Sequence, residues 1–144
     1  MSLKDGSKKM SKSELSDLSR INLTDNKDQI INKIKKAKTD PMPMPNGLQE
    51  LDERPEAKNL LGIYASLTNT NLEKSIENFS GKNFSVFKES LSEILVNKIE
   101  PISIEIKKLL ADQKYLDQIL LEGVEKANII ASKKIRKIKE IVGF

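Results

Sequence analysis

The residues whose types and spacing could do chemistry are two lysines and two serines in one short segment. They stand in Lys9-Met10-Ser11-Lys12-Ser13, within a stretch rich in lysine, serine, aspartate and glycine. Two ammonium groups on a short loop can meet the negative charge of a departing phosphate group, and serine hydroxyls can donate hydrogen bonds to its oxygens. A solvated Lys- and Ser-rich loop without function has the same composition, so the segment alone leaves both interpretations open.

Composition narrows the other chemistry available to the chain. The 144 residues contain no cysteine and no histidine. Disulfides, thiolate nucleophiles, histidine bases and metal sites built from Cys or His are therefore excluded. Catalytic groups have to come from Lys, Ser, Asp or Glu, and we predict no metal site in the chain.

The elements that must position the segment are predicted to be helices. The first twenty or so residues have few apolar positions and predict an exposed loop. Asp25 stands where an N-cap is expected, before apolar residues at helical spacing, so we predict a helix over about Asn26–Lys38. Residues 39–47 contain three prolines and a glycine and predict a loop that ends this helix.

Three further helices are predicted between this loop and the last helix of the chain. Pro55 suits the first position of the first of these helices. Residues 72–79 form a second, short amphipathic helix, which Gly81 can close in left-handed geometry. Ser85 is the predicted N-cap of a longer helix, which Pro101 should bend or break.

The last helix is predicted over about residues 112–142, with apolar residues near a period of 3.6. No sustained alternation predicts a strand, apart from a lone candidate near Leu3. The fold class is therefore mainly α, a helical bundle preceded by a loop.

Charge is distributed unevenly along the chain. Residues 1–40 carry a net charge of +4, residues 41–122 carry −4, and residues 123–144 carry +4. Basic ends suit a polyanion that contacts the chain at selected places, although for any single cluster we favour a solvated lysine-rich face. The chain shows no signal peptide and no apolar stretch of membrane-spanning length, so we expect a cytoplasmic protein with no membrane partner.

The segment resembles the second signature of class I aminoacyl-tRNA synthetases, and the resemblance is to the bacterial tryptophanyl-tRNA synthetases. The lead-in Met1-Ser2-Leu3-Lys4-Asp5-Gly6 is similar to that family, as are four later stretches in the same order. Those stretches are Ile34–Asp40, Arg54-Pro55-Glu56, Asn59–Tyr64 and Gly81–Phe84 with Phe87-Lys88. The ending, from Glu122 to Phe144, looks like the family's closing helix, so the resemblance covers essentially the whole chain.

The resemblance implies which parts of the chain do what. Residues 1–22 would be a catalytic-loop remnant at the end of a Rossmann-type nucleotide-binding domain, and residues 23–144 a helical region that binds the tRNA anticodon. Lys9 and Lys12 would be catalytic, and the whole segment, Lys9, Met10, Ser11, Lys12 and Ser13, would bind ATP, supplied with Mg²⁺. The partners would be ATP, L-tryptophan and tRNA(Trp), and no anticodon-reading residue can be assigned.

The family's first signature and its tryptophan pocket lie before the point at which this sequence begins. On the resemblance, Met1 matches an internal methionine, and we expect a carboxy-terminal part of the enzyme that is inactive alone. The full-length family forms homodimers, mainly through the part that this chain lacks, so the resemblance does not assure a dimer here.

Three functional hypotheses follow. The first is tryptophan–tRNA ligation in a complex with the other half of the enzyme. The second is a helical RNA-binding module without catalysis, whose basic faces at Lys33–Lys38 and Lys133–Lys139 hold phosphates. The third is an inactive product that exposes apolar surface and self-associates. Arg20 and Arg54 could contact nucleic acid, but we expect both to form internal salt bridges.

Overall fold

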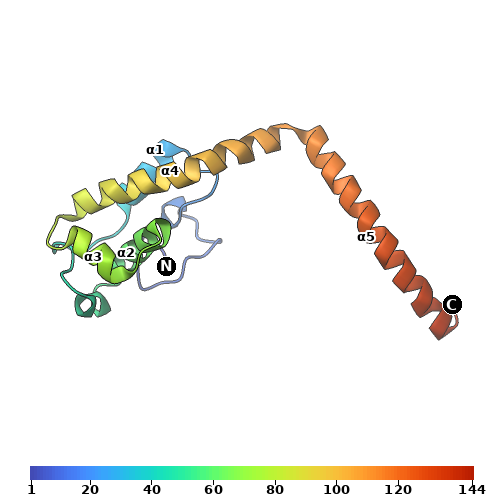
Figure 1. Cartoon of the computed structure of the whole chain (residues 1–144), viewed down its shortest axis with the longest axis horizontal. Coiled ribbons are helices and arrows are strands. Elements are labelled where there is room, and N and C mark those ends of the chain that lie inside the picture. The colour runs from blue at the N-terminus through green and yellow to red at the C-terminus, as the bar shows by residue number, and fades with distance from the viewer. The chain divides into compact units, whose positions relative to one another are not determined.

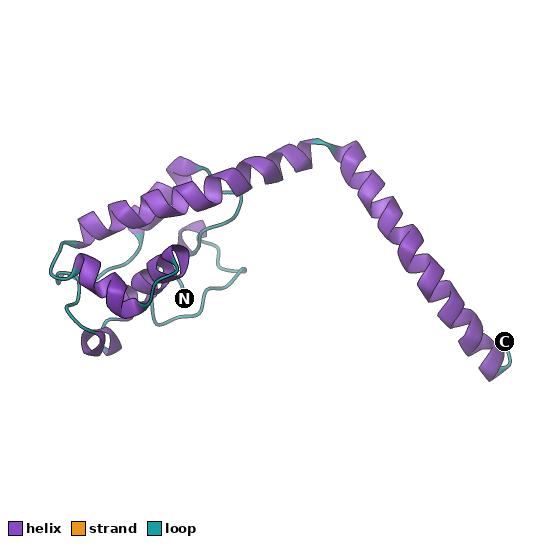
Figure 2. Ribbon diagram, viewed as in Figure 1, coloured by secondary structure: helices purple, strands orange, loops and turns teal.

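The computed structural model describes all residues from Met1 to Phe144, and every regular element in it is helical (Figures 1 and 2). The prediction of a mainly α fold is confirmed, and the candidate strand near Leu3 is absent. The chain separates into two units, Met1–Ile104 and Glu105–Phe144, which are described separately below.

The first helix, α1, covers Lys27–Lys36 and follows a short 3-10 turn, η1, at Asp17–Ser19. The predicted N-cap at Asp25 is wrong by one residue. Asn26 caps α1 in a reciprocal capping box: its side chain accepts from the Gln29 backbone, and the Gln29 side chain accepts from the Asn26 backbone. Asp25 is thereby free to serve another partner, Lys33.

The next two helices are α2, Pro55–Thr68, and α3, Leu72–Phe79. Pro55 occupies the first turn of α2 as predicted, where its missing N–H costs nothing. Asn69 ends α2 in left-handed geometry at φ 53°, which asparagine tolerates, and Asn71 caps α3. Gly81 adopts φ 68° after α3, as its predicted role in closing that helix requires.

The long helix α4 covers Phe84–Ala111. The helix begins one residue before Ser85, so the predicted cap at Ser85 is wrong. Pro101 lies inside the helix without breaking it, so a break at this position is also wrong. The turn before Pro101 therefore lacks one backbone hydrogen bond, but the chain remains helical.

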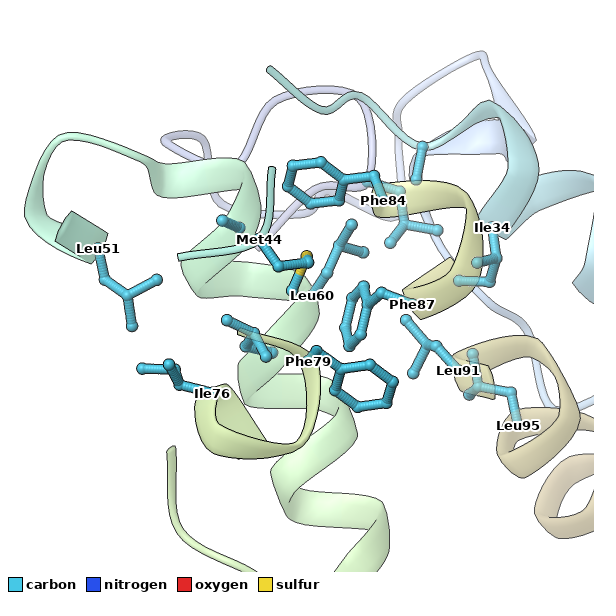
Figure 3. Close-up of a cluster of buried hydrophobic side chains, with 14 of the residues drawn as sticks. Ile34, Met44, Leu51, Leu60, Ile76, Phe79, Phe84, Phe87, Leu91 and Leu95 are labelled. Atoms are coloured by element: carbon cyan, nitrogen blue, oxygen red, sulfur yellow. The ribbon is translucent and has the colours of Figure 1, made fainter. Parts of the chain in front are cut away.

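The core of Met1–Ile104 gathers where α2, α3 and α4 meet (Figure 3). Phe79 and Phe87 pack edge to face with ring centroids 4.9 Å apart, and Tyr64 lies 5.0 Å from Phe79. Such aromatic pairs add to the stabilisation from burial alone. Leu60 and Leu91 line the same cluster, and both are fully buried.

The proline loop between α1 and α2 is fixed to this core by a buried arginine. The 3-10 turn η2, Leu48–Asp52, lies within this connection. The Arg54 guanidinium donates to both Asp40 carboxylate oxygens, at 3.0 and 2.7 Å, and to the Pro43 carbonyl at 2.7 Å. Burial opposes the ionisation of Asp40, but the hydrogen bonds from Arg54 and the Met42 backbone lower its pKa overall. The expected internal salt bridge of Arg54 is confirmed.

The second unit, Glu105–Phe144, consists of the end of α4 and the helix α5, Gln113–Val142. Asp112 caps α5 through the Tyr115 backbone, and Gly143 closes it at φ 84°. The predicted last helix is confirmed with nearly the predicted bounds. None of its residues is buried, including its apolar stripe.

None of the helices is long and apolar enough to cross a membrane.

Candidate functional site

The segment at Lys9–Ser13 lies on a loop whose two ends are joined by the backbone. The Leu3 amide donates to the Ser19 carbonyl at 2.9 Å, and the Lys38 amide donates to the Leu3 carbonyl at 2.8 Å. Leu3 is buried, whereas all residues from Ser7 to Leu15 are exposed. The segment therefore stands out into solvent from a base that is attached to the helical core.

Gly6 is required at this base by space rather than by flexibility. A Cβ atom at Gly6 would lie 2.4 Å from the Pro55 carbonyl oxygen, at the start of α2, and that backbone atom cannot rotate away. Gly6 therefore lies where the loop packs against the backbone of α2.

The two lysines of the segment have free ammonium groups. Lys9 and Lys12 form no ion pair, whereas the neighbouring loop lysines are paired, Lys4 with Glu14 at 4.0 Å and Lys8 with Asp5 at 3.2 Å. The pKa of Asp5 is lowered to about 2 by hydrogen bonds from the Ser7 hydroxyl, Lys8 and the Ser7 backbone. Two positive charges therefore remain available to an anion, and both are in the segment.

The residues of the segment differ in their hydrogen bonds and in whether they line a hollow at the loop. The hydroxyls of Ser11 and Ser13 lie 2.8 Å apart and form one hydrogen-bonded pair. Lys9 and Ser11 line a hollow of about 250 Å³ at the loop, together with Ser2, Lys4 and Lys8 among others, whereas Lys12 and Ser13 do not. Met10 is 38% exposed.

The basic face predicted at Lys33–Lys38 is smaller than the sequence indicated. Lys33 is only 3% exposed, and its ammonium group donates to both Asp25 oxygens at 2.9 and 2.7 Å and also contacts Asp17 at 2.5 Å. Lys38 is occupied by Glu56 at 2.8 Å, a pair that raises the pKa of Lys38 and lowers that of Glu56. Lys33 cannot hold a phosphate from this position, and Lys38 is already engaged.

Sequence reasoning missed the group that braces the segment. The Arg20 guanidinium donates to the carbonyls of Ser11 and Glu14 and pairs with Asp17. The expectation of an internal salt bridge at Arg20 is confirmed, but nothing in the sequence pattern connected it to the loop. The only available signal was an arginine placed shortly after an exposed lysine-rich segment.

The basic residues near the end of α5 are exposed as their spacing predicted. Lys133, Lys134, Arg136, Lys137 and Lys139 form no ion pair. The chain contains no group of three or more acidic side chains that could hold a metal ion.

Comparison with known proteins identifies the family of the chain. The sequence matches the tRNA synthetases class I (W and Y) over residues 1–100. The whole chain is 50% identical to the tryptophan–tRNA ligase of Agrobacterium fabrum and 49% identical to that of Rickettsia felis. The chain spans 41% and 43% of the lengths of these two relatives.

Among solved structures, the fold is similar to the tryptophanyl-tRNA synthetase from Mycoplasma pneumoniae. The TM-score is 0.68 at 26% sequence identity, over 100% of this chain and 45% of that one. The family match, the sequence identity and the shared fold agree, and the resemblance expected from the sequence is confirmed. The chain belongs to the class I tRNA synthetases of the tryptophan and tyrosine group.

Proposed function

We propose that the chain supplies the phosphate-binding loop and the tRNA-binding helices of a tryptophan–tRNA ligase. In this proposal residues 1–22 end the catalytic domain, residues 23–144 bind tRNA(Trp), and the work is done in the cytoplasm. The observation that carries it is the pair of unpaired ammonium groups at Lys9 and Lys12 on an exposed loop with an anchored base. Tryptophan–tRNA ligases that are about half identical to this chain support it.

The proposed reaction begins with activation of tryptophan by ATP. A carboxylate oxygen of tryptophan attacks the α-phosphorus, the bond from that phosphorus to the bridging oxygen breaks, and pyrophosphate leaves with the negative charge. Lys9 and Lys12 stabilise this charge as it develops, and the hydroxyls of Ser11 and Ser13 donate to phosphate oxygens. The tryptophanyl group then passes from the adenylate to tRNA(Trp).

Magnesium enters this proposal only with its substrate. The chain has no acidic cluster that could hold the ion, so Mg²⁺ would arrive bound to the ATP phosphates. No step of the reaction is assigned to a metal held by this chain. The lysines of the loop would share the phosphate charge with that ion.

Tryptophan-dependent exchange of pyrophosphate into ATP tests the proposal. The chain is assayed alone and then mixed with the amino-terminal half of one of its tryptophan–tRNA ligase relatives, and we expect exchange in the mixture only. In the active mixture Lys12→Ala should slow adenylate formation at least about tenfold, because one transition-state cation is lost. Lys8→Ala removes a neighbouring lysine that Asp5 already neutralises, and it should have a much smaller effect. Equal effects of both substitutions would contradict the role of Lys12.

A second function is favoured by the end of α5. Five exposed cations without ion pairs, on about two turns of the helix, could hold RNA phosphates without any ATP chemistry. Binding of tRNA by the chain alone should then weaken steeply as salt rises from about 50 to 200 mM, since counterions are released. Replacing Lys133, Lys134 and Lys137 by glutamine should reduce this salt dependence, whereas Lys12→Ala should not.

A further inference from the structure

Arg20 contacts the loop on both sides of Lys12. Its Nη1 atom donates to the Ser11 carbonyl at 3.4 Å and to the Glu14 carbonyl at 3.3 Å. Lys12 and Ser13 form the turn between these two carbonyls, which a further bond from the Glu14 amide to the Ser11 carbonyl closes at 3.4 Å. One guanidinium therefore holds the backbone from which the Lys12 side chain projects.

Arg20 is itself held in place by two side chains, Asp17 within η1 and Asn22 just after it. Its Nε atom donates to the Asn22 side-chain oxygen at 3.2 Å, and its Nη2 atom lies 3.4 Å from the Asp17 carboxylate. The planar guanidinium can make these contacts and reach two carbonyls together, because its N–H groups point in fixed directions. A lysine at this position has one ammonium group and cannot serve all four acceptors.

Asp17 and Asn22 connect Arg20 to the helical core. The Asn22 side-chain nitrogen donates to the Asp17 carboxylate at 2.7 Å, and the Asn22 backbone N–H donates to the Asp25 carboxylate at 2.8 Å. Lys33 of α1 pairs with both Asp17 and Asp25, and hydrogen bonds from Lys33 and Asn22 lower the pKa of Asp17. Asp17 thus remains ionised near neutral pH and keeps its attraction for Arg20.

The contacts weaken from the core toward the loop. Around buried Lys33 and Asp25 the distances are 2.5 to 2.9 Å, whereas those that Arg20 makes are 3.2 to 3.4 Å and partly exposed. Longer and solvated hydrogen bonds are weaker and exchange with water more readily. The contacts of Arg20 are therefore the weaker part of the connection between the loop and α1.

We propose that Arg20 is a positioning residue that sets the direction of the Lys12 side chain by holding the carbonyls of Ser11 and Glu14. This role rests on the proposed function, because it concerns how Lys12 is presented to the phosphates. Arg20 touches neither ATP nor tryptophan in this role. Its loss leaves the lysines present but poorly directed, and poor direction of a charged group lowers the rate of the chemical step.

The first test measures the loop in the 144-residue chain itself. Amide hydrogen exchange and ¹⁵N relaxation are recorded for residues 11–14 in the wild type, Arg20→Ala, Arg20→Lys and Arg136→Ala. We expect faster exchange and larger motion of these amides in Arg20→Ala and an intermediate result in Arg20→Lys. Arg136→Ala, an exposed site on α5, should match the wild type. Unchanged protection of α1 shows that each variant has folded, and loop amides that do not respond to Arg20→Ala would overturn the proposal.

The second test uses pyrophosphate exchange in the mixture described above. Arg20→Ala should lower kcat by about tenfold and leave the KM for tryptophan unchanged, with Arg20→Lys in between. A looser loop with unchanged kcat would overturn the positioning role. Absence of exchange in the wild-type mixture would instead contradict the proposed function, while the amide measurements would still decide whether Arg20 braces the loop.

Discussion

The two units of the chain use the same kind of sequence pattern with different results. In Met1–Ile104 the apolar stripes of the helices are buried, and Phe87, Leu60 and Leu91 are inaccessible to solvent. In Glu105–Phe144 the helix α5 has an equally regular stripe, and none of its residues is buried. Helical periodicity therefore predicts a helix in both units, but it does not predict what covers the apolar face.

The same difference holds for charged residues. In Met1–Ile104 Lys33 and Arg54 are buried and paired with Asp25 and Asp40. In α5 five cations near the end of the helix are exposed and unpaired. Substitutions should thus affect global stability in the first unit and mainly local helicity or RNA binding in the second.

The largest effect is expected from truncation of a core aromatic residue. Phe87→Ala should lower the free energy of unfolding by about 3–5 kcal/mol, because it removes a fully buried ring and leaves a cavity. Ile138→Ala in α5 is the matched control and should change it by less than about 0.5 kcal/mol. Urea unfolding followed by far-UV circular dichroism measures both. A comparable loss in the two variants would show that the stripe of α5 is covered in solution.

Removal of a buried cation should cause the second-largest loss of stability. Lys33→Met leaves the Asp25 carboxylate buried without its partner and should cost about 3 kcal/mol. Lys137→Met on α5 removes an exposed cation and should leave thermal unfolding nearly unchanged. Adding Asp25→Asn to Lys33→Met should recover part of the loss, since the unpaired charge is then gone. No recovery in the double variant would mean that packing, rather than charge, sets the cost.

Lowering the pH should reduce the stability of Met1–Ile104 through its paired carboxyl groups. Asp17, Asp40 and Glu56, all in Met1–Ile104, have a folded-state pKa below the ordinary value of an acidic side chain. Their contribution to stability is therefore complete above the unfolded pKa of about 4 and is lost as pH falls through the folded values. The melting temperature should therefore fall as pH drops below about 4. Asp40→Asn should show a smaller fall over this range, and an identical pH profile would contradict the assignment.

The smallest effects are expected at the helix caps. Asn26→Ala removes the capping box of α1 and should cost about 1 kcal/mol of global stability. Asp112→Ala removes the cap of α5 and should instead speed amide exchange in residues 113–117, with little change in the melting temperature. The contrast is lost if Asp112→Ala destabilises the whole chain as much as Asn26→Ala does.

Local signals predicted the helices because their causes are local. Pro55 starts α2, Gly81 closes α3, and the last helix has nearly the predicted bounds. The errors are also local: Asn26 rather than Asp25 caps α1, and the capping residues compete within one or two positions. Of the bend or break expected at Pro101, the break is wrong, because α4 continues through this residue. The missing bond at one proline does not outweigh the packed residues of α4 such as Phe87, Leu91 and Leu95.

The sequence predicted an exposed, lysine-rich loop but not the contacts that hold the loop to the rest of the unit. Lys9 and Lys12 stand out in the sequence by spacing, and their exposure agrees with that pattern. The brace at Arg20 and the burial of Lys33 depend on residues that come together only after the chain has turned back on itself. Gly6 shows the same limit, because its neighbour in space, Pro55, is far away in the sequence.

The sequence by itself determined the helical class, most helix boundaries, the family resemblance and the segment at Lys9–Ser13. Each follows from short-range preferences or from residue spacing along the chain. Only the tertiary structure decided which lysines are free. Lys33 and Lys12 are the same type of residue in similarly basic stretches, yet one is buried against Asp25 and the other has no partner. The charge available to a phosphate is set by which carboxylates the fold brings within reach, and periodicity carries no information on that.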